Sequence, residues 1–118
     1  MMMLPSPVRV YVATTPTDLR KSFDGLSILV SSLPEGDPTS GHLYCFFNRR
    51  GNQVRVLYWD RSGYCIFAKR LAQGRFHLRH VEGEHVAEMD AAELGLILEG
   101  LDLSAASRRK RFRLLRAA

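Results

Sequence analysis

The order of hydrophobic and polar residues predicts a sheet with one helix inserted in it and one helix after it. Residues 8–12 alternate loosely and are rich in β-branched and aromatic side chains, which is typical of a strand. Three further strand-like runs follow at 42–48, 53–59 and 64–71. The separators 49–52 and 60–63 are short and contain glycine, so we expect an antiparallel meander. Residues 74–79 predict a shorter extra strand.

Two segments have the periodicity of helices. Apolar residues recur at steps of four and three along 19–33, and Thr15 with Pro16 has the chemistry of a helix start. Asp18 would then lie near the positive end of the helix dipole. Gly25, in the middle of this helix, lowers helix stability by ~1 kcal/mol relative to alanine. Its presence indicates either that the helix packs closely on the sheet there or that the cost is tolerated. Asp90, three residues before Glu93, predicts the cap of a second helix that ends near residue 100.

These elements predict an α+β fold. In it an antiparallel sheet, made of the three-stranded meander with the N-terminal strand and the short extra strand, packs with two helices. The length of 118 residues suits one domain, which we place at 1–104. Residues 105–118 form a basic tail, which we expect to be disordered or to become helical on a partner.

The middle strand predicts a sheet with two chemically different faces, because successive side chains point to opposite sides. One face carries Val54, Val56 and Tyr58, which we expect in the core, whereas the other face carries Arg55 and Trp59. Cations interleaved with aromatic rings on an accessible face supply phosphate contacts and base stacking together. The alternative is that the large aromatic residues belong to a second small core under one of the helices.

Charge is segregated along the chain far more than the net charge of +5 suggests. Residues 40–80 carry eight arginines and lysines against one aspartate, residues 81–103 carry seven carboxylates and no arginine or lysine, and the tail adds six cations. Such blocks indicate a face that binds a polyanion. The alternative is that the acidic segment packs on the sheet or the tail and neutralises it internally.

Candidate chemistry beyond charge is sparse, so we expect neither an enzyme nor a cofactor. Cys45 and Cys65 lie in apolar runs without metal-ligand spacing, which predicts two buried thiols. Histidines at 77, 80 and 85 match no standard metal-ligand pattern, and no nucleophile elbow organises the serines. Asp18 and Asp24 are too far apart around a helix to converge as a catalytic pair. No apolar run approaches the ~18 residues of a membrane span, and a cytoplasmic bacterial protein is expected.

Several ordered motifs resemble those of one family. The run DLRKSFDGL at 18–26 resembles the opening of the small accessory protein, usually called TnpB or the second-frame product, of insertion-sequence sixty-six transposons. The runs SGHL, LYWD, GY, AKRL, GRF and LEGLD, between residues 40 and 102, are similar to later motifs of that family in the same order. Gln73 departs from the glutamate that the family typically has. The resemblance covers residues 5–103 and implies an accessory role beside a transposase.

The charge pattern suggests the site residues, and the resemblance suggests the partners. We expect transposon-end DNA, the cognate transposase or both as partners, with nucleoid association if DNA is bound, and we expect no membrane or small-molecule ligand. An adaptor that docks on the transposase without touching DNA is the alternative. Arg20 and Lys21 are candidates for partner binding, or else a solvated helix face. The candidates for nucleic-acid binding are Arg49, Arg50, Arg55, Trp59, Lys69, Arg70, Arg75, Arg108, Arg109, Lys110 and Arg111.

Overall fold

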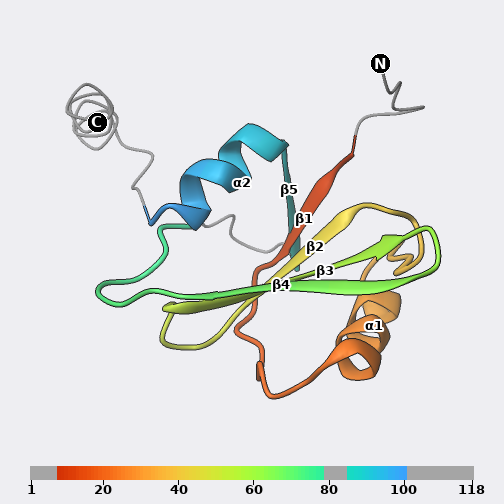
Figure 1. The fold of residues 1–118 in the computed structure, drawn as a ribbon, viewed down its shortest axis with the longest axis horizontal. Helices are drawn as coiled ribbons and strands as arrows, with labels where there is room; N and C mark the ends of the chain where they lie inside the picture. The colour runs from red at the N-terminus through yellow and green to blue at the C-terminus, as the bar shows by residue number, and fades with distance from the viewer. Residues whose placement is uncertain (1–7, 79–84, 101–118) are drawn as a thin grey trace.

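The computed structural model describes residues 8–78 and 85–100 and contains five strands and two helices within them (Figure 1). In chain order these are β1 (Val10–Ala13), α1 (Phe23–Ser32), β2 (Leu43–Phe47), β3 (Gln53–Asp60), β4 (Gly63–Arg70), β5 (Val86–Met89) and α2 (Ala91–Leu98). The tail and the acidic residues at 82 and 84 lie outside the described residues. None of the described helices is long and apolar enough to cross a membrane.

The strands form one mixed sheet in the order β4-β3-β2-β1-β5. Only β1 and β2 run parallel, and α1 lies in the connection that joins them, as parallel pairing requires. The three antiparallel strands of the predicted meander are confirmed, and so is the α+β class. The fifth strand, however, is β5, which pairs with β1.

The prediction of a strand at 74–79 is therefore wrong. Gly74 has a left-handed φ of 78°, which takes the chain out of the extended conformation before a ladder begins. The N–H of Phe76 donates to the carbonyl of Gly51 at 2.7 Å, and the Phe76 ring is buried. This segment is thus irregular, and it places the side chain of Phe76 in the core.

The predicted start of the first helix is also wrong, because α1 begins at Phe23 with Ser22 in the capping position. Residues 14–22 form a loop instead. The N–H of Thr17 donates to the carbonyl of Phe47 at 2.8 Å, which ties the loop to the end of β2. A side chain at Gly25 would meet the side chain of Lys21, 3.0 Å from its Cβ, so the close approach is to this loop rather than to the sheet.

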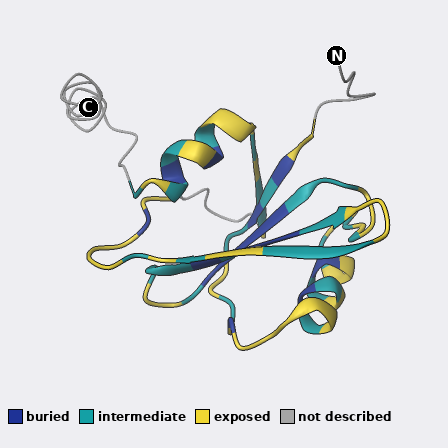
Figure 2. Cartoon of the chain, viewed as in Figure 1, coloured by how far each residue is buried: buried dark blue, intermediate teal, exposed yellow. Residues whose placement is uncertain are grey.

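Each face of the sheet is covered by one helix (Figures 1 and 2). Leu94 and Ile97 of α2 pack on one face, where the predicted core residues of β3 lie. Leu26 and Val30 of α1 pack on the other, against a second core of Leu19, Tyr44, Phe46 and Leu57. The expectation of an open, mixed sheet face is therefore wrong, since a second core under α1 occupies much of it.

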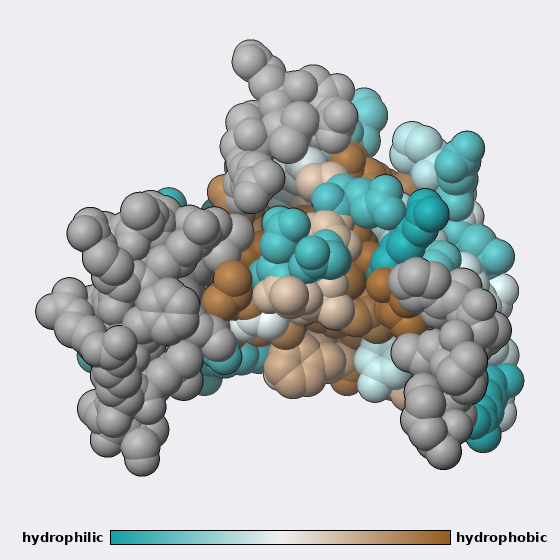
Figure 3. Space-filling view, turned by 90° about the horizontal axis from the view of Figure 1, so that it is seen from above, coloured by the Kyte–Doolittle hydropathy of each residue, from teal (hydrophilic) through white to brown (hydrophobic). Residues whose placement is uncertain are grey.

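The second helix agrees with its predicted cap. The Asp90 carboxylate accepts from the N–H of Glu93 at 2.8 Å, and α2 ends at Leu98 before Gly100, whose φ is 77°. Seen from above, this side of the molecule has apolar surface in its middle and hydrophilic side chains over and around it (Figure 3).

Candidate functional site

A groove with arginines on both sides lies at the end of the sheet where β2 turns into β3. We call it the basic groove. It has a volume of about 670 Å³ and runs between the loop before α1 and the β2–β3 turn. Its lining comprises Pro16, Thr17, Asp18, Leu19, Arg20, Asn48, Arg49, Arg50, Gln53 and Arg55. Four arginines and one carboxylate thus share one concave surface.

The β2–β3 turn presents Arg49 and Arg50 because Asn48 closes it. The Asn48 Oδ1 accepts from the N–H groups of Asn52 and Gln53, each at 3.0 Å, and its Nδ2 donates to the Asn52 Oδ1 at 2.8 Å. The turn needs a residue with positive φ, which Gly51 supplies at 72°. Both arginines are exposed and make no ion pair with any residue in 8–78 or 85–100.

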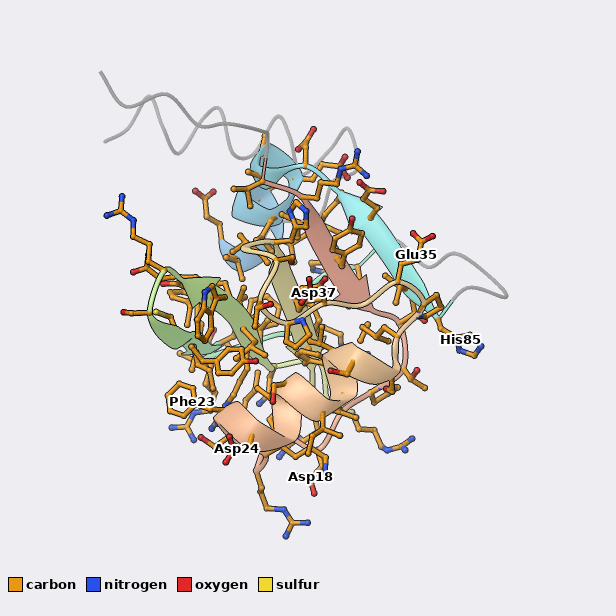
Figure 4. The ribbon with its side chains drawn as sticks, turned by 90° about the vertical axis from the view of Figure 1, so that its right-hand side faces the viewer. Asp18, Phe23, Asp24, Glu35, Asp37 and His85 are labelled. Atoms are coloured by element: carbon orange, nitrogen blue, oxygen red, sulfur yellow. The ribbon has the colours of Figure 1, made fainter. Side chains whose placement is uncertain are left out.

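The opposite wall is the loop before α1, in which Asp18 organises Arg20. The Asp18 carboxylate accepts from the backbone N–H of Arg20 at 3.0 Å and from its Nη2 at 2.7 Å. These hydrogen bonds hold the pKa of Asp18 well below its usual range. Asp18 therefore orders the loop and does not act on the helix dipole, since Asp24 is the acidic residue in the first turn of α1 (Figure 4). Leu19, between the two partners, is buried and anchors the loop in the core under α1.

Arg55 joins the two walls. It lies on β3 opposite Phe46, on the sheet face that α1 covers, and its Nη1 donates to the carbonyl of Lys21 at 3.3 Å. Arg55 as a residue is partly buried and lines the groove between the loop and the turn. The Lys21 side chain runs instead over Gly25 and lines a neighbouring cavity of about 530 Å³ beneath α1.

Two more of the predicted arginines flank the groove. Arg70 pairs across the β3–β4 ladder with Gln53, which lines the groove. Arg75 directly precedes Phe76, whose N–H donates to the carbonyl of Gly51 in the β2–β3 turn. Both side chains are exposed. They extend the cationic surface along the same end of the sheet.

Lys69 and Trp59 are not brought to this surface. Lys69 lies on the opposite face, and its Nζ donates to the carbonyl of Leu98 at the end of α2 at 2.5 Å. Trp59 is at the far end of β3, half-buried and edge-to-face with Tyr64 at a centroid distance of 5.0 Å. Phe67, one of the large aromatic residues for which a second core was the alternative, is 45% exposed. Arg108, Arg109, Lys110 and Arg111 lie outside the described residues.

The sequence assigned Arg20 to a different role from Arg49, Arg50 and Arg55, although the four line one groove. No sequence pattern pointed to Asn48 or Thr17, although their hydrogen bonds fix the two walls of the groove. The recurrence of a basic pair at 20–21 and again at 49–50 was the available signal in the sequence.

The two cysteines and the possible metal ligands among the described residues form no second site. Among the described residues no group of three potential ligands gathers to hold a metal ion. Cys45 is buried, and burial raises the pKa of its thiol to about 12. Cys65, also predicted to be buried, is partly accessible.

Two of the comparisons with known proteins found matches to this chain. The family model described as "IS66 Orf2 like protein" matches residues 8–108. Protein y4hO of Sinorhizobium fredii, described as uncharacterized, is 39% identical over 102 residues, which are 85% of this chain and 88% of the relative. Protein y4jC of the same organism, described in the same way, is 34% identical over 102 residues, 86% of each chain. No solved structure matches. The chain therefore belongs to the IS66 Orf2-like family of accessory proteins of transposition.

Proposed function

We propose that this chain acts in transposition as a non-catalytic protein that binds the phosphates of transposon-end DNA through the basic groove. One observation carries the proposal. Arginines from segments thirty residues apart in sequence line a single groove, and the one carboxylate in its lining is already paired with Arg20. The basic tail at 105–118 adds further phosphate contacts in this proposal.

The composition of the groove favours contacts to the backbone of a duplex. Exposed guanidinium groups donate paired hydrogen bonds to phosphate oxygens and carry no sequence preference in doing so. Binding of unstacked bases uses aromatic platforms, and the ten lining residues include no aromatic ring. Of the acidic residues within 85–100, Glu88 pairs with Arg9 rather than with a groove arginine.

The test is a salt titration of binding between the full chain and a duplex carrying the transposon ends. Each phosphate contact contributes a slope of ~0.9 to the fall of log K with log salt. The double variant Arg49→Gln and Arg50→Gln should therefore lower the slope by about 1.8 and weaken binding at every salt concentration. Arg61→Gln, in the exposed β3–β4 turn at the other end of the hairpin, is the control and should change little.

Removal of residues 105–118 separates the two sources of charge. The proposal requires that the truncated chain still binds the duplex and still responds to the double variant. Binding that disappears with the tail, or that ignores Arg49 and Arg50, would show that the groove is not the DNA site.

A second function, an adaptor that docks on the transposase, is favoured by one feature of α1. Phe23 belongs to the 18–26 run yet projects outward from the first turn of the helix, 45% exposed (Figure 4). Co-purification of the transposase from a nuclease-treated lysate, lost in Phe23→Ser and kept in Ile28→Ser, would support the adaptor. Ile28 is a suitable control because it is 69% exposed on the same helix.

A further inference from the structure

β4, eight residues long, forms an edge of the sheet, and no strand among the described residues pairs with its outer side (Figure 1). Its partner within the described sheet is β3 alone. Proteins usually protect such edges with proline, a bulge or a charge pointing inward. β4 has no proline, its register with β3 is unbroken over all eight pairs, and its one inward-facing charge, Lys69, lies near the end of the strand rather than at its middle.

The register identifies which backbone groups of β4 point outward. The N–H of Leu71 donates to the carbonyl of Asn52 at 2.8 Å and continues the β3–β4 ladder. Bonded and non-bonded pairs alternate in an antiparallel ladder, so the odd-numbered residues of β4 bond to β3. The even-numbered residues, Tyr64, Ile66 and Ala68, therefore direct their N–H and C=O groups away from the sheet.

The side chains beside these groups form an apolar centre. Phe67 lies opposite Val56, on the face that α2 covers, yet it is 45% exposed. Ala68 next to it is also exposed. An aromatic ring at the middle of an open edge, with polar backbone groups on both sides of it, has the chemistry of a strand-pairing surface.

We propose that β4 pairs antiparallel with β4 of a second copy of this chain, about a two-fold axis at Phe67. The outward groups of even-numbered residues then bond to one another, Ile66 opposite Ala68 and Tyr64 opposite Arg70. Phe67 meets its own copy in a non-bonded pair, where side chains lie closest. Antiparallel pairing keeps the two basic ends apart and sets the Arg70 guanidinium beside the Tyr64 ring, a favourable cation–π pair.

The first test is the oligomeric state of the full chain, measured by sedimentation over a range of concentrations. The wild type should have twice the mass of one chain. Ala68→Pro removes an outward N–H and should shift the protein to the monomer. Phe67→Lys places two like charges opposite each other and should do the same, whereas Ile28→Lys, on exposed α1, should remain a dimer.

The second test fixes the register by cross-linking. In a Cys65→Ser background, Phe67→Cys should form a covalent dimer on mild oxidation, because Cα atoms of a non-bonded pair are ~4.5 Å apart, within disulfide reach. Lys69→Cys in the same background should not cross-link. A monomer at all concentrations, or a dimer unaffected by both edge variants, would overturn the proposal. Cross-linking of the wild type through Cys65 would overturn the register, since it places the axis at that residue.

Discussion

Asn48 offers a way to disturb the basic groove without changing a charge. Its side chain makes three hydrogen bonds that close the β2–β3 turn, two to backbone N–H groups and one to Asn52. At a net ~1 kcal/mol for each, Asn48→Ala should lower the free energy of unfolding by roughly 2–3 kcal/mol. For a domain of this size that corresponds to a fall in Tm of about 10–20 °C.

Urea denaturation followed by circular dichroism measures this loss. Asn48→Asp is the matched control, because a carboxylate keeps both acceptor bonds to the N–H groups of Asn52 and Gln53, and it should retain most of the stability. Asn48→Ala should also weaken duplex binding in the proposed function, since Arg49 and Arg50 lose their fixed positions. A stability loss below about 0.5 kcal/mol would refute the conclusion that the side chain of Asn48 holds the turn.

Three shorter predictions follow from other contacts. Because Arg20 depresses the pKa of Asp18, their pairing stabilises the fold above the unfolded pKa of ~3.9 and is lost as the pH falls through the lower, folded value. Asp18→Asn should thus flatten the acid side of the stability profile, and it should tighten polyanion binding by releasing Arg20. In native protein a thiol reagent should modify Cys65 and spare Cys45 until denaturant is added, as thiol counting by absorbance would show. Leu57→Ala, fully buried under α1, should cost ~2–5 kcal/mol in urea denaturation, and a near-neutral result would contradict the second core.

The meander was predictable because its information is local. Alternation along 53–59 and 64–71 and the glycines at 51 and 63 specify strands and tight turns within a few residues of each other. The cap of α2 was predictable for the same reason, since Asp90 and the N–H of Glu93 are three residues apart.

The start of α1 and the strand β5 depend on distant parts of the chain. Thr15 and Pro16 have the chemistry of a helix start, but the bond from the Thr17 N–H to β2 holds this segment as a loop. β5 has only four residues, and its extended conformation comes from pairing with β1. Neither contact has a signature in the local pattern.

The candidate site was likewise predictable only in part. The residue types were predictable from the basic block, and strand alternation alone separates Lys69 from Arg70 onto opposite faces. The meeting of Arg20 with Arg49 and Arg50 was not predictable, because it depends on the loop before α1 closing onto the end of β2.

The crossover through α1 has a consequence for when the groove exists during folding. The hairpins β2–β3 and β3–β4 join neighbours in sequence, whereas β1 reaches β2 only after a connection of about thirty residues has closed. One wall of the groove belongs to a hairpin and the other to that connection. A fragment that begins after α1 would keep three of the four arginines yet possess no groove, so the groove forms only once the crossover connection has packed against the β2–β3 hairpin.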